Sequence, residues 1–150
     1  MKSNPRRTRR KSQSIRLWTL GEARAAAPYI ASVARSIREY ALEARNQRRL
    51  LKSFAEKPGR PDRAALIAQE DASRQLARAE DQLREAMQEL DELDICCLDP
   101  IGGQVLVPFV QDEQLAWYIF DLFDPHYFRA WRYQSDPEET RRKLTALRMT

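Results

Sequence analysis

The chain has 150 residues, of which 43% are hydrophobic and 32% are charged, and its formal net charge is +4. No apolar run approaches the roughly 18 residues that a membrane span requires, and the basic N-terminus lacks the apolar segment of a secretory signal. The two adjacent cysteines and the single histidine exclude a disulfide framework and a four-ligand zinc site within one copy. We therefore expect a cytoplasmic protein of one domain plus an extension, with no cofactor and no membrane contact.

Residues 1–16 form the predicted extension, a disordered basic N-terminal arm. This segment has seven basic side chains and no acidic one, whereas the remainder has 19 basic and 22 acidic residues. Without an apolar pattern such a segment cannot bury enough surface to fold. It either holds a phosphate backbone without sequence preference, through counterion release, or serves only as a solubilising tail. The candidate nucleic-acid contacts are Arg6, Arg7, Arg9, Arg10 and Lys11.

Residues 17–95 are predicted to form a long antiparallel helical hairpin. The segment from Thr19 to Glu22 has the pattern of a capping box, and Pro28 should kink the first helix. Residues 57–61 contain two prolines and a glycine and mark the break between the helices. On both sides of this break, a seam of mostly apolar residues recurs at spacings of three and four. The seam residues are Ile30, Val33, Ile37, Tyr40, Ala44, Gln47, Leu51 and Phe54 in the first helix, and Ala65, Gln69, Ala72, Leu76, Ala79, Leu83, Ala86, Leu90 and Leu93 in the second.

One register aligns the two helices over their whole length. Folding the chain about residues 58–59 places Ala44 opposite Leu76, and the layers on either side follow in step. Most layers match a larger residue with a smaller one, as an interdigitated core requires. We therefore favour a specific hairpin over the alternative, which is two separate amphipathic helices in a bundle.

The end of the second helix is acidic. Residues 80–94 hold seven acidic side chains and one basic side chain, Arg84. Carboxylates at the C-terminal end of a helix oppose its dipole, which favours a basic partner there, either another subunit or the N-terminal arm. A solvated acidic face is the alternative. The candidate surface residues are Glu85, Glu89 and Glu92.

Residues 99–134 are predicted to form a small antiparallel β-meander of three strands. The strands are residues 104–110, 115–123 and 128–133, and each is rich in branched or aromatic side chains. Pro108 cannot donate a ladder hydrogen bond, so we expect its strand at the edge of the sheet.

Residues 136–148 are predicted to form a short C-terminal helix. Asp136 can cap it, Pro137 suits its first position and Glu139 its third. The fold class is therefore expected to be α+β and mostly α. A coiled-coil-like hairpin, a three-stranded meander and this helix would form a single domain over residues 17–150.

The middle strand of the predicted sheet is apolar on both faces, and one hairpin covers only one of them. Trp117 and Ile119 lie on one face, and Tyr118 and Phe120 on the other. We expect these four residues to contribute an interaction surface that forms a homodimer or docks a protein partner. The N-terminal arm or the C-terminal segment is the alternative cover for the second face.

Three stretches of the chain have the pattern of a known family. They are Leu17-Trp18-Thr19-Leu20-Gly21-Glu22-Ala23 with Pro28, Asp99-Pro100 with Gly103-Gln104-Val105-Leu106-Val107-Pro108-Phe109, and the segment from Ala116-Trp117 to Trp131 with Arg141-Arg142-Lys143-Leu144. They resemble the DUF2203 family of uncharacterised prokaryotic proteins, which has an opening aromatic-Thr-Leu-x-Glu-Ala segment, an Asp-x-x-x-Gly-Leu-x-Asp-Phe segment and a strand ending in Trp-His. The resemblance frames residues 17–147 and implies no activity.

The chain departs from this family pattern at several polar positions. The family's usual Cys-Trp-Arg-Leu-Gly-Glu is replaced by a mostly apolar sequence at residues 116–121. The histidine expected after Trp131 is Arg132, and the acidic residue expected before Phe109 is Pro108. A pocket that relied on those polar groups would therefore be incomplete in this chain.

The strongest candidate for a chemical site is the group Asp121, His126 and Arg132, near one edge of the predicted sheet. Cys96 or Cys97 would lie nearby, and we expect both thiols to be buried or half-buried. Asp121 and His126 are only weak metal candidates, because a lone histidine in a turn is usually exposed. The sequence has no Gly-rich phosphate loop, zinc-protease motif or nucleophile elbow, so we expect no catalytic residues.

The leading hypothesis from the sequence is a non-catalytic interaction or scaffold protein. Nucleic-acid association through the N-terminal arm is one alternative. Another is a small-ligand or metal-binding pocket between the sheet and the helix kink, although aromatic side chains at this density also form ordinary core. The lining residues would be Trp18, Tyr29, Trp117 and Trp131.

Overall fold

The computed structural model describes residues 15–146 of the chain as two long helices followed by a small sheet. The elements are α2 (Leu20–Glu56), α3 (Arg63–Asp91), β1 (Cys96–Asp99), β2 (Gln104–Gln111), β3 (Gln114–Asp121), β4 (Phe128–Tyr133), β5 (Arg142–Lys143) and a 3₁₀ helix η1 (Leu144–Ala146). The strands form one antiparallel sheet in sequence order. The α+β, mostly helical fold class is thereby confirmed. The predicted disorder of the N-terminal arm concerns residues that lie largely outside the described range.

The predicted capping box at Thr19 and the predicted break between the two helices are confirmed. The Thr19 hydroxyl accepts a hydrogen bond from the Glu22 backbone N–H at 3.1 Å, and the Glu22 carboxylate accepts one from the Thr19 N–H at 2.9 Å. Asp62 caps α3 by accepting from the Ala65 N–H at 2.8 Å. Between the helices, Gly59 has a φ of +86°, which glycine adopts without steric cost.

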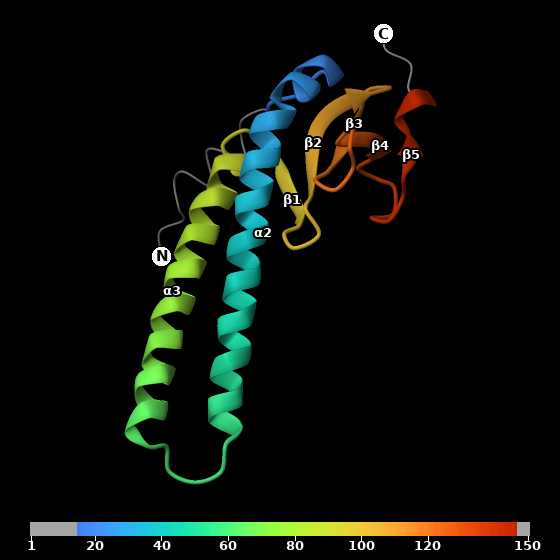
Figure 1. The fold of residues 1–150 in the computed structure, drawn as a ribbon. Coiled ribbons are helices and arrows are strands. Elements are labelled where there is room, and N and C mark those ends of the chain that lie inside the picture. Colours follow the sequence, from blue (N-terminus) through green and yellow to red (C-terminus); the bar gives the residue numbers. More distant parts are fainter. Residues whose placement is uncertain (1–14, 147–150) are drawn as a thin grey trace, which may run out of the picture.

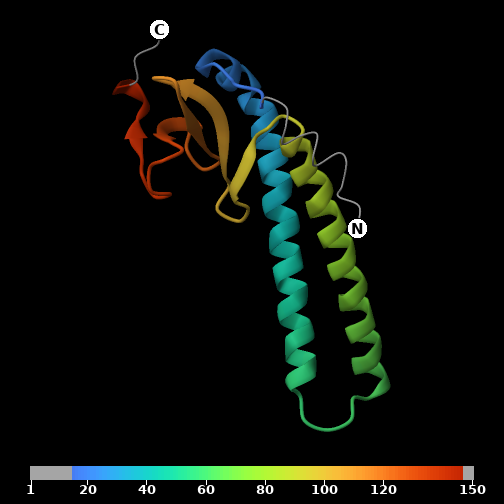
Figure 2. The same cartoon turned by 180° about the vertical axis from the view of Figure 1, so that it is seen from behind.

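The hairpin seam is also confirmed, because every residue assigned to it is buried or half-buried. Small residues such as Ala44, Ala72 and Ala79 let the two helices approach closely. Figures 1 and 2 show that α2 lies between α3 and the sheet, and that the hairpin extends far beyond the sheet. Pro28 lies inside α2, and the first turns of this helix lean away from its main axis, as predicted (Figure 1).

The sheet has five strands where the sequence predicts three. The predicted strands correspond to β2, β3 and β4, which are consecutive neighbours in the sheet. β1 was missed because its four residues include two cysteines and an aspartate, and so lack a strand-like pattern. β5 was missed because it is two basic residues long and is defined only by pairing with Ala130 and Trp131.

The expected edge position of the strand containing Pro108 is wrong, because β2 lies between β1 and β3. The pairing of β1 ends opposite Leu106, however, so Pro108 lies beyond the end of that neighbour. There the Pro108 carbonyl accepts a hydrogen bond from the Trp18 backbone N–H at 2.8 Å. No neighbouring strand is therefore left without a hydrogen bond by the missing N–H of Pro108. At this position the segment before α2, and not β1, lies beside β2.

The predicted helix over residues 136–148 is wrong for its described part. Residues 137–140 form a single turn, and β5 and η1 follow. The reason is that Asp136 does not cap a helix. Its carboxylate accepts from the Tyr133 backbone N–H at 2.9 Å and receives two hydrogen bonds from the Arg142 guanidinium, at 2.8 and 2.9 Å.

The Asp136–Arg142 pair predicts a specific acid sensitivity. The hydrogen bonds from Arg142 lower the pKa of Asp136 from 3.8 to about 2. Because the folded-state pKa lies below the unfolded value, the stabilisation is complete above about pH 4 and is lost as the pH falls toward 2. We expect Asp136→Asn to flatten the dependence of the melting temperature on pH in this window, as measured by circular dichroism. An unchanged pH dependence in the variant would contradict this role of the pair.

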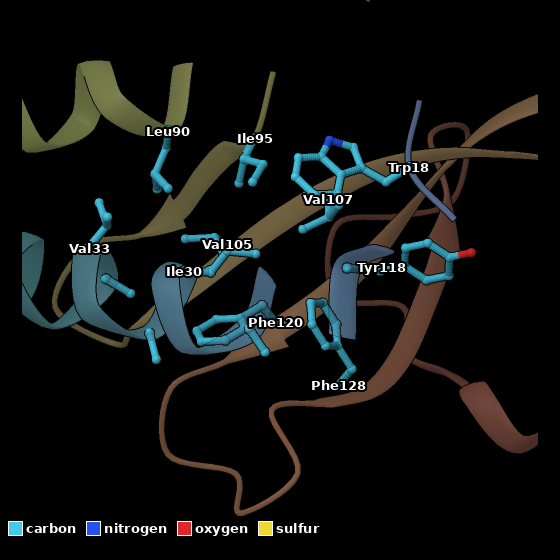
Figure 3. Close-up of a cluster of buried hydrophobic side chains, with 14 of the residues drawn as sticks. Trp18, Ile30, Val33, Leu90, Ile95, Val105, Val107, Tyr118, Phe120 and Phe128 are labelled. Carbon is cyan, nitrogen blue, oxygen red and sulfur yellow. The ribbon is translucent and has the colours of Figure 1, made fainter. Parts of the chain in front are cut away.

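The main core lies between α2 and the facing side of the sheet. Ile30 and Val33 from α2, and Val105 and Phe120 from the sheet, are buried there (Figure 3). Aromatic rings continue the core along the sheet, with Phe109 stacked on Tyr118 at a centroid separation of 3.8 Å. Burial of this many apolar side chains at one end of the hairpin explains why the sheet docks there.

The opposite face of the sheet is covered as well. Leu106, Pro108 and Ile119 point away from α2 and are nevertheless buried. The segment after β4 contacts this face, since the Trp117 indole N–H donates to the Gln134 side chain. The apolar second face, from which we expected a homodimer, is therefore covered within one chain and no longer argues for a second copy.

The turn between β2 and β3 predicts a stabilising substitution. Asp112 and Glu113 have φ values of +53° and +61°, as in a type I′ turn, where residues other than glycine are disfavoured. We expect Glu113→Gly to raise the free energy of unfolding by about 0.5–1 kcal/mol in urea denaturation. Asp112→Gly should raise the free energy of unfolding by less, because it loses the hydrogen bond that the Asp112 carboxylate accepts from the Tyr133 hydroxyl at 2.7 Å. Equal gains in both variants would contradict this explanation.

Candidate functional site

The structure does not bring together the polar group predicted from the sequence. Asp121 ends β3 and accepts from the Phe123 backbone N–H at 2.9 Å, and His126 lies in the following turn. Arg132 pairs with Trp117, in the middle of β3 and four residues before Asp121. The antiparallel register therefore separates Arg132 from Asp121 and His126. Within residues 15–146 no three His, Cys, Asp or Glu side chains gather in a way that would hold a metal ion.

Arg132 is a buried side chain rather than an edge residue, with an exposed fraction of 7%. One terminal nitrogen donates to the backbone carbonyls of Tyr133 and Asp136, at 3.2 and 3.4 Å. Its Nε has no hydrogen-bond partner among the described residues. The guanidinium thus holds the segment after β4 against the sheet, which is a structural role.

The two thiols are free, and both are poor nucleophiles at neutral pH. Cys96 is exposed, contrary to expectation, and Cys97 is half-buried. Burial, followed by the neighbouring Cys96 and Asp99, raises the pKa of Cys97 to about 11. Burial and then Asp91 also raise the pKa of the Cys96 thiol. Because the thiolate is the reactive form, neither side chain is prepared for covalent catalysis.

The predicted aromatic pocket does not form. Trp18 and Trp131 are buried in the core, whereas Trp117 lies on the opposite face of the sheet. Tyr29 is exposed on α2, where its hydroxyl donates to the Glu89 carboxylate at 3.5 Å. A hollow does lie beside the kink at Pro28, but different residues line it.

The predicted interaction surface is divided by the structure. Tyr118, Phe120 and Ile119 are buried, so they offer no surface to a partner, and Trp117 is half-buried. For the three buried residues the expectation was wrong because both faces of the sheet are covered within the chain, whereas for Trp117 it stays a prediction. The acidic candidates are exposed: Glu85 and Glu89 lie on α3, and Glu92 is its C-cap residue.

A basic part of the hairpin lies far from the sheet. We call residues 45–78 the distal hairpin. It has nine basic and four acidic side chains, whereas residues 79–94 have one basic and seven acidic side chains. Comparing the charge of the far end with that of the near end would have revealed this polarity before the structure was known. None of the helices in the described part has the length and apolar character needed to cross a membrane.

The nucleic-acid candidates in the N-terminal arm, from Arg6 to Lys11, lie outside the described residues. Arg16, at the end of that arm, is described and is tied to the fold. Its backbone N–H donates to the Asp94 carboxylate at 2.7 Å, and its guanidinium lies 3.7 Å from the centre of the Trp18 ring. Any free arm therefore stops short of this residue.

Comparison with known proteins gives one family. Residues 16–125 match the family described as an uncharacterized conserved protein, DUF2203. The match includes both helices and most of the sheet, and it confirms the resemblance seen in the sequence. Searches of the curated proteins and of the solved structures find no match.

Proposed function

We propose that this chain, which belongs to the DUF2203 family, is a non-catalytic interaction protein whose distal hairpin docks on an acidic protein surface. One observation carries the proposal: the distal hairpin leaves the folded core. Side chains of α2 pack against the core as far as Tyr40, and those of α3 pack there again from Leu83 onward. Between these points the two helices face each other and extend away from the sheet (Figure 1).

The charge of the distal hairpin supports an acidic partner. Among the described residues, Arg48 is the one basic side chain of the nine that forms an ion pair, with Glu80 at 2.8 Å. Nine basic side chains against four acidic ones leave the distal hairpin with a net charge of +5 on a projecting element. Such charge steers an oppositely charged surface into contact and selects against basic ones.

The seam of the distal hairpin suits a docking role because it holds the helices together without a wide apolar face. Ala72 is buried, while Leu51, Phe54 and Leu76 are only half-buried. Gln47 and Gln75 are hydrogen-bonded across the helices at 3.1 Å, which adds a polar contact to the seam. The distal hairpin can therefore project into solvent as a folded element and still present its charged outer surface.

Shortening the distal hairpin tests the proposal directly. Deleting residues 48–54 together with residues 65–71 removes one heptad from each helix and keeps the seam in phase. Each helix becomes about 10 Å shorter, while the sheet and the core are untouched. We expect the shortened protein to fold and to lose the partner that the full chain captures from cell extract, at low salt and after nuclease treatment.

A matched pair of charge reversals provides the control. Arg35 and Arg49 are exposed on α2 two heptads apart, and only Arg49 lies in the distal hairpin. We expect Arg49→Glu to reduce capture and Arg35→Glu to leave it unchanged. Equal capture by all variants would reject the distal hairpin as the docking element.

Two further outcomes would redirect the proposal. If nuclease abolishes capture, and deletion of residues 1–14 does so too, the partner is nucleic acid held by the N-terminal arm. If sedimentation at micromolar concentration gives a dimer that the heptad deletion converts to a monomer, the partner is a second copy. Either result would contradict an acidic protein partner.

A further inference from the structure

A hollow lies where the leaning first turns of α2 meet the β3–β4 turn and the end of the described chain. Its volume is about 830 Å³, within the range of small-molecule binding sites. The hollow is independent of the distal hairpin, because its lining comes from the second turn of α2, residues 126–129 and residues 143–145.

The charged lining of this hollow is entirely basic. It consists of Arg24 from α2, Arg129 from β4 and Lys143 from β5, and the His126 imidazole from the turn also lines the hollow. Arg129 forms an ion pair with Asp124, which is not among the lining residues. The side chains of Arg24 and Lys143 form no ion pair with any described residue. Two positive charges from distant parts of the chain therefore line one space without an ion-pair partner among residues 15–146.

The remaining wall of the hollow is apolar and includes the helix kink. Pro28, Phe128 and Leu144 line it, and the last two are buried. Because Pro28 has no N–H, it cannot donate to the carbonyl of Arg24, one turn earlier. The site thus combines a cationic side with an apolar side, as a pocket for an amphipathic anion does.

We propose that this hollow binds a phosphorylated small molecule. Its phosphate lies between Arg24, Arg129 and Lys143, and its apolar body rests on Pro28 and Phe128. A phosphate monoester carries a charge of about −1.5 to −2 at neutral pH, which matches the two uncompensated cations. A single carboxylate would neutralise only one of them. Guanidinium and ammonium groups that converge from separate elements are also well suited to the several oxygens of a phosphate.

Two probes with the same ring and different anions test the proposal. Phenyl phosphate and benzoate are titrated into the full chain at low salt, with binding measured by isothermal calorimetry. We expect phenyl phosphate to bind about tenfold or more tightly than benzoate, because it engages one further charged group. Inorganic phosphate should compete with phenyl phosphate.

Variants assign the binding to the hollow. Arg24→Gln and Lys143→Gln should each weaken phenyl phosphate binding by about tenfold. Arg49→Gln, the same change on an exposed arginine of the distal hairpin, should leave the affinity unchanged. Melting curves of the variants check the fold, and Arg24→Lys should restore part of the affinity because it keeps the charge.

Three results would overturn the proposal. The first is the absence of phenyl phosphate binding at millimolar concentration. The second is equal binding of benzoate and phenyl phosphate, which would reject phosphate as the recognised group. The third is an equal loss of affinity in Arg49→Gln, which would show that the anion responds only to overall charge.

Discussion

Replacing Phe120 by alanine should lower the free energy of unfolding by about 3–5 kcal/mol, because it empties the centre of the core. The exposed fraction of Phe120 is 0%. Its ring stacks on Tyr127 at a centroid separation of 5.0 Å and meets the edge of Phe128 at 5.5 Å. The side chain thus joins β3 to β4 beneath α2. Urea denaturation followed by circular dichroism measures the loss.

Phe123 is the matched control for this substitution. It lies three residues later and its exposed fraction is 62%, although its ring is 5.1 Å from the Arg38 guanidinium. We expect Phe123→Ala to change the free energy of unfolding by about 0.5 kcal/mol or less. Similar losses in the two variants would mean that the α2-facing side of β3 is not the centre of the core.

The helical hairpin was predictable because its pattern is local and repeated. The positions of Ala44, Ala72 and Ala79 in the seam follow from spacings of three and four along each helix, and no contact with the sheet is needed to place them. The Thr19 cap depends on residues three positions apart, so it could be recognised in the same way. Short-range rules therefore account for the longest elements of the molecule.

The ends of the sheet were not predictable, because they depend on contacts between distant residues. The Asp136-Pro137 pattern suits a helix start, but no helix begins here, because the Asp136 carboxylate accepts two hydrogen bonds from Arg142. β1 and β5 likewise exist only through pairing with β2 and β4. Tertiary contacts of this kind override local preference.

The turn between β1 and β2 depends both on local sequence and on a contact with a distant residue. The Asp99 carboxylate accepts from the Gly102 N–H at 2.9 Å, and Gly103 has a φ of +74°. A Cβ atom on Gly103 would approach the Leu122 side chain to 2.7 Å, so both conformation and space favour glycine. The sequence indicates a turn here, whereas the contact with Leu122 required the structure.

The candidate sites, like the ends of the sheet, depend on contacts between residues that are distant in the sequence. Asp121 and Arg132 were expected near one edge, and only the register of β3 with β4 shows that they lie apart. The basic hollow joins Arg24 to Lys143, which are far apart in the chain, so no sequence spacing could have indicated it. The charge of the distal hairpin was readable from the sequence, but its significance depends on the helices leaving the core.

Trp18 should be as important to stability as Phe120, although it precedes the first helix. Its exposed fraction is 5%, its backbone N–H donates to the Pro108 carbonyl at 2.8 Å, and its indole N–H donates to the Leu93 carbonyl at 3.2 Å. One residue thus joins the start of α2, the end of β2 and the segment after α3. Trp18→Ala should lower the free energy of unfolding by about 3–5 kcal/mol in urea denaturation.

Two further substitutions separate the contributions of Trp18. Trp18→Phe keeps most of the apolar ring but loses the indole hydrogen bond to Leu93. The lost hydrogen bond should lower the free energy of unfolding by about 1 kcal/mol, in addition to the loss that the smaller ring causes. Trp117→Ala removes the same side chain from a half-buried position on the opposite face of the sheet and should cost less than Trp18→Ala. If Trp117→Ala proved the more damaging change, the outer face rather than this three-way junction would hold the sheet to the hairpin.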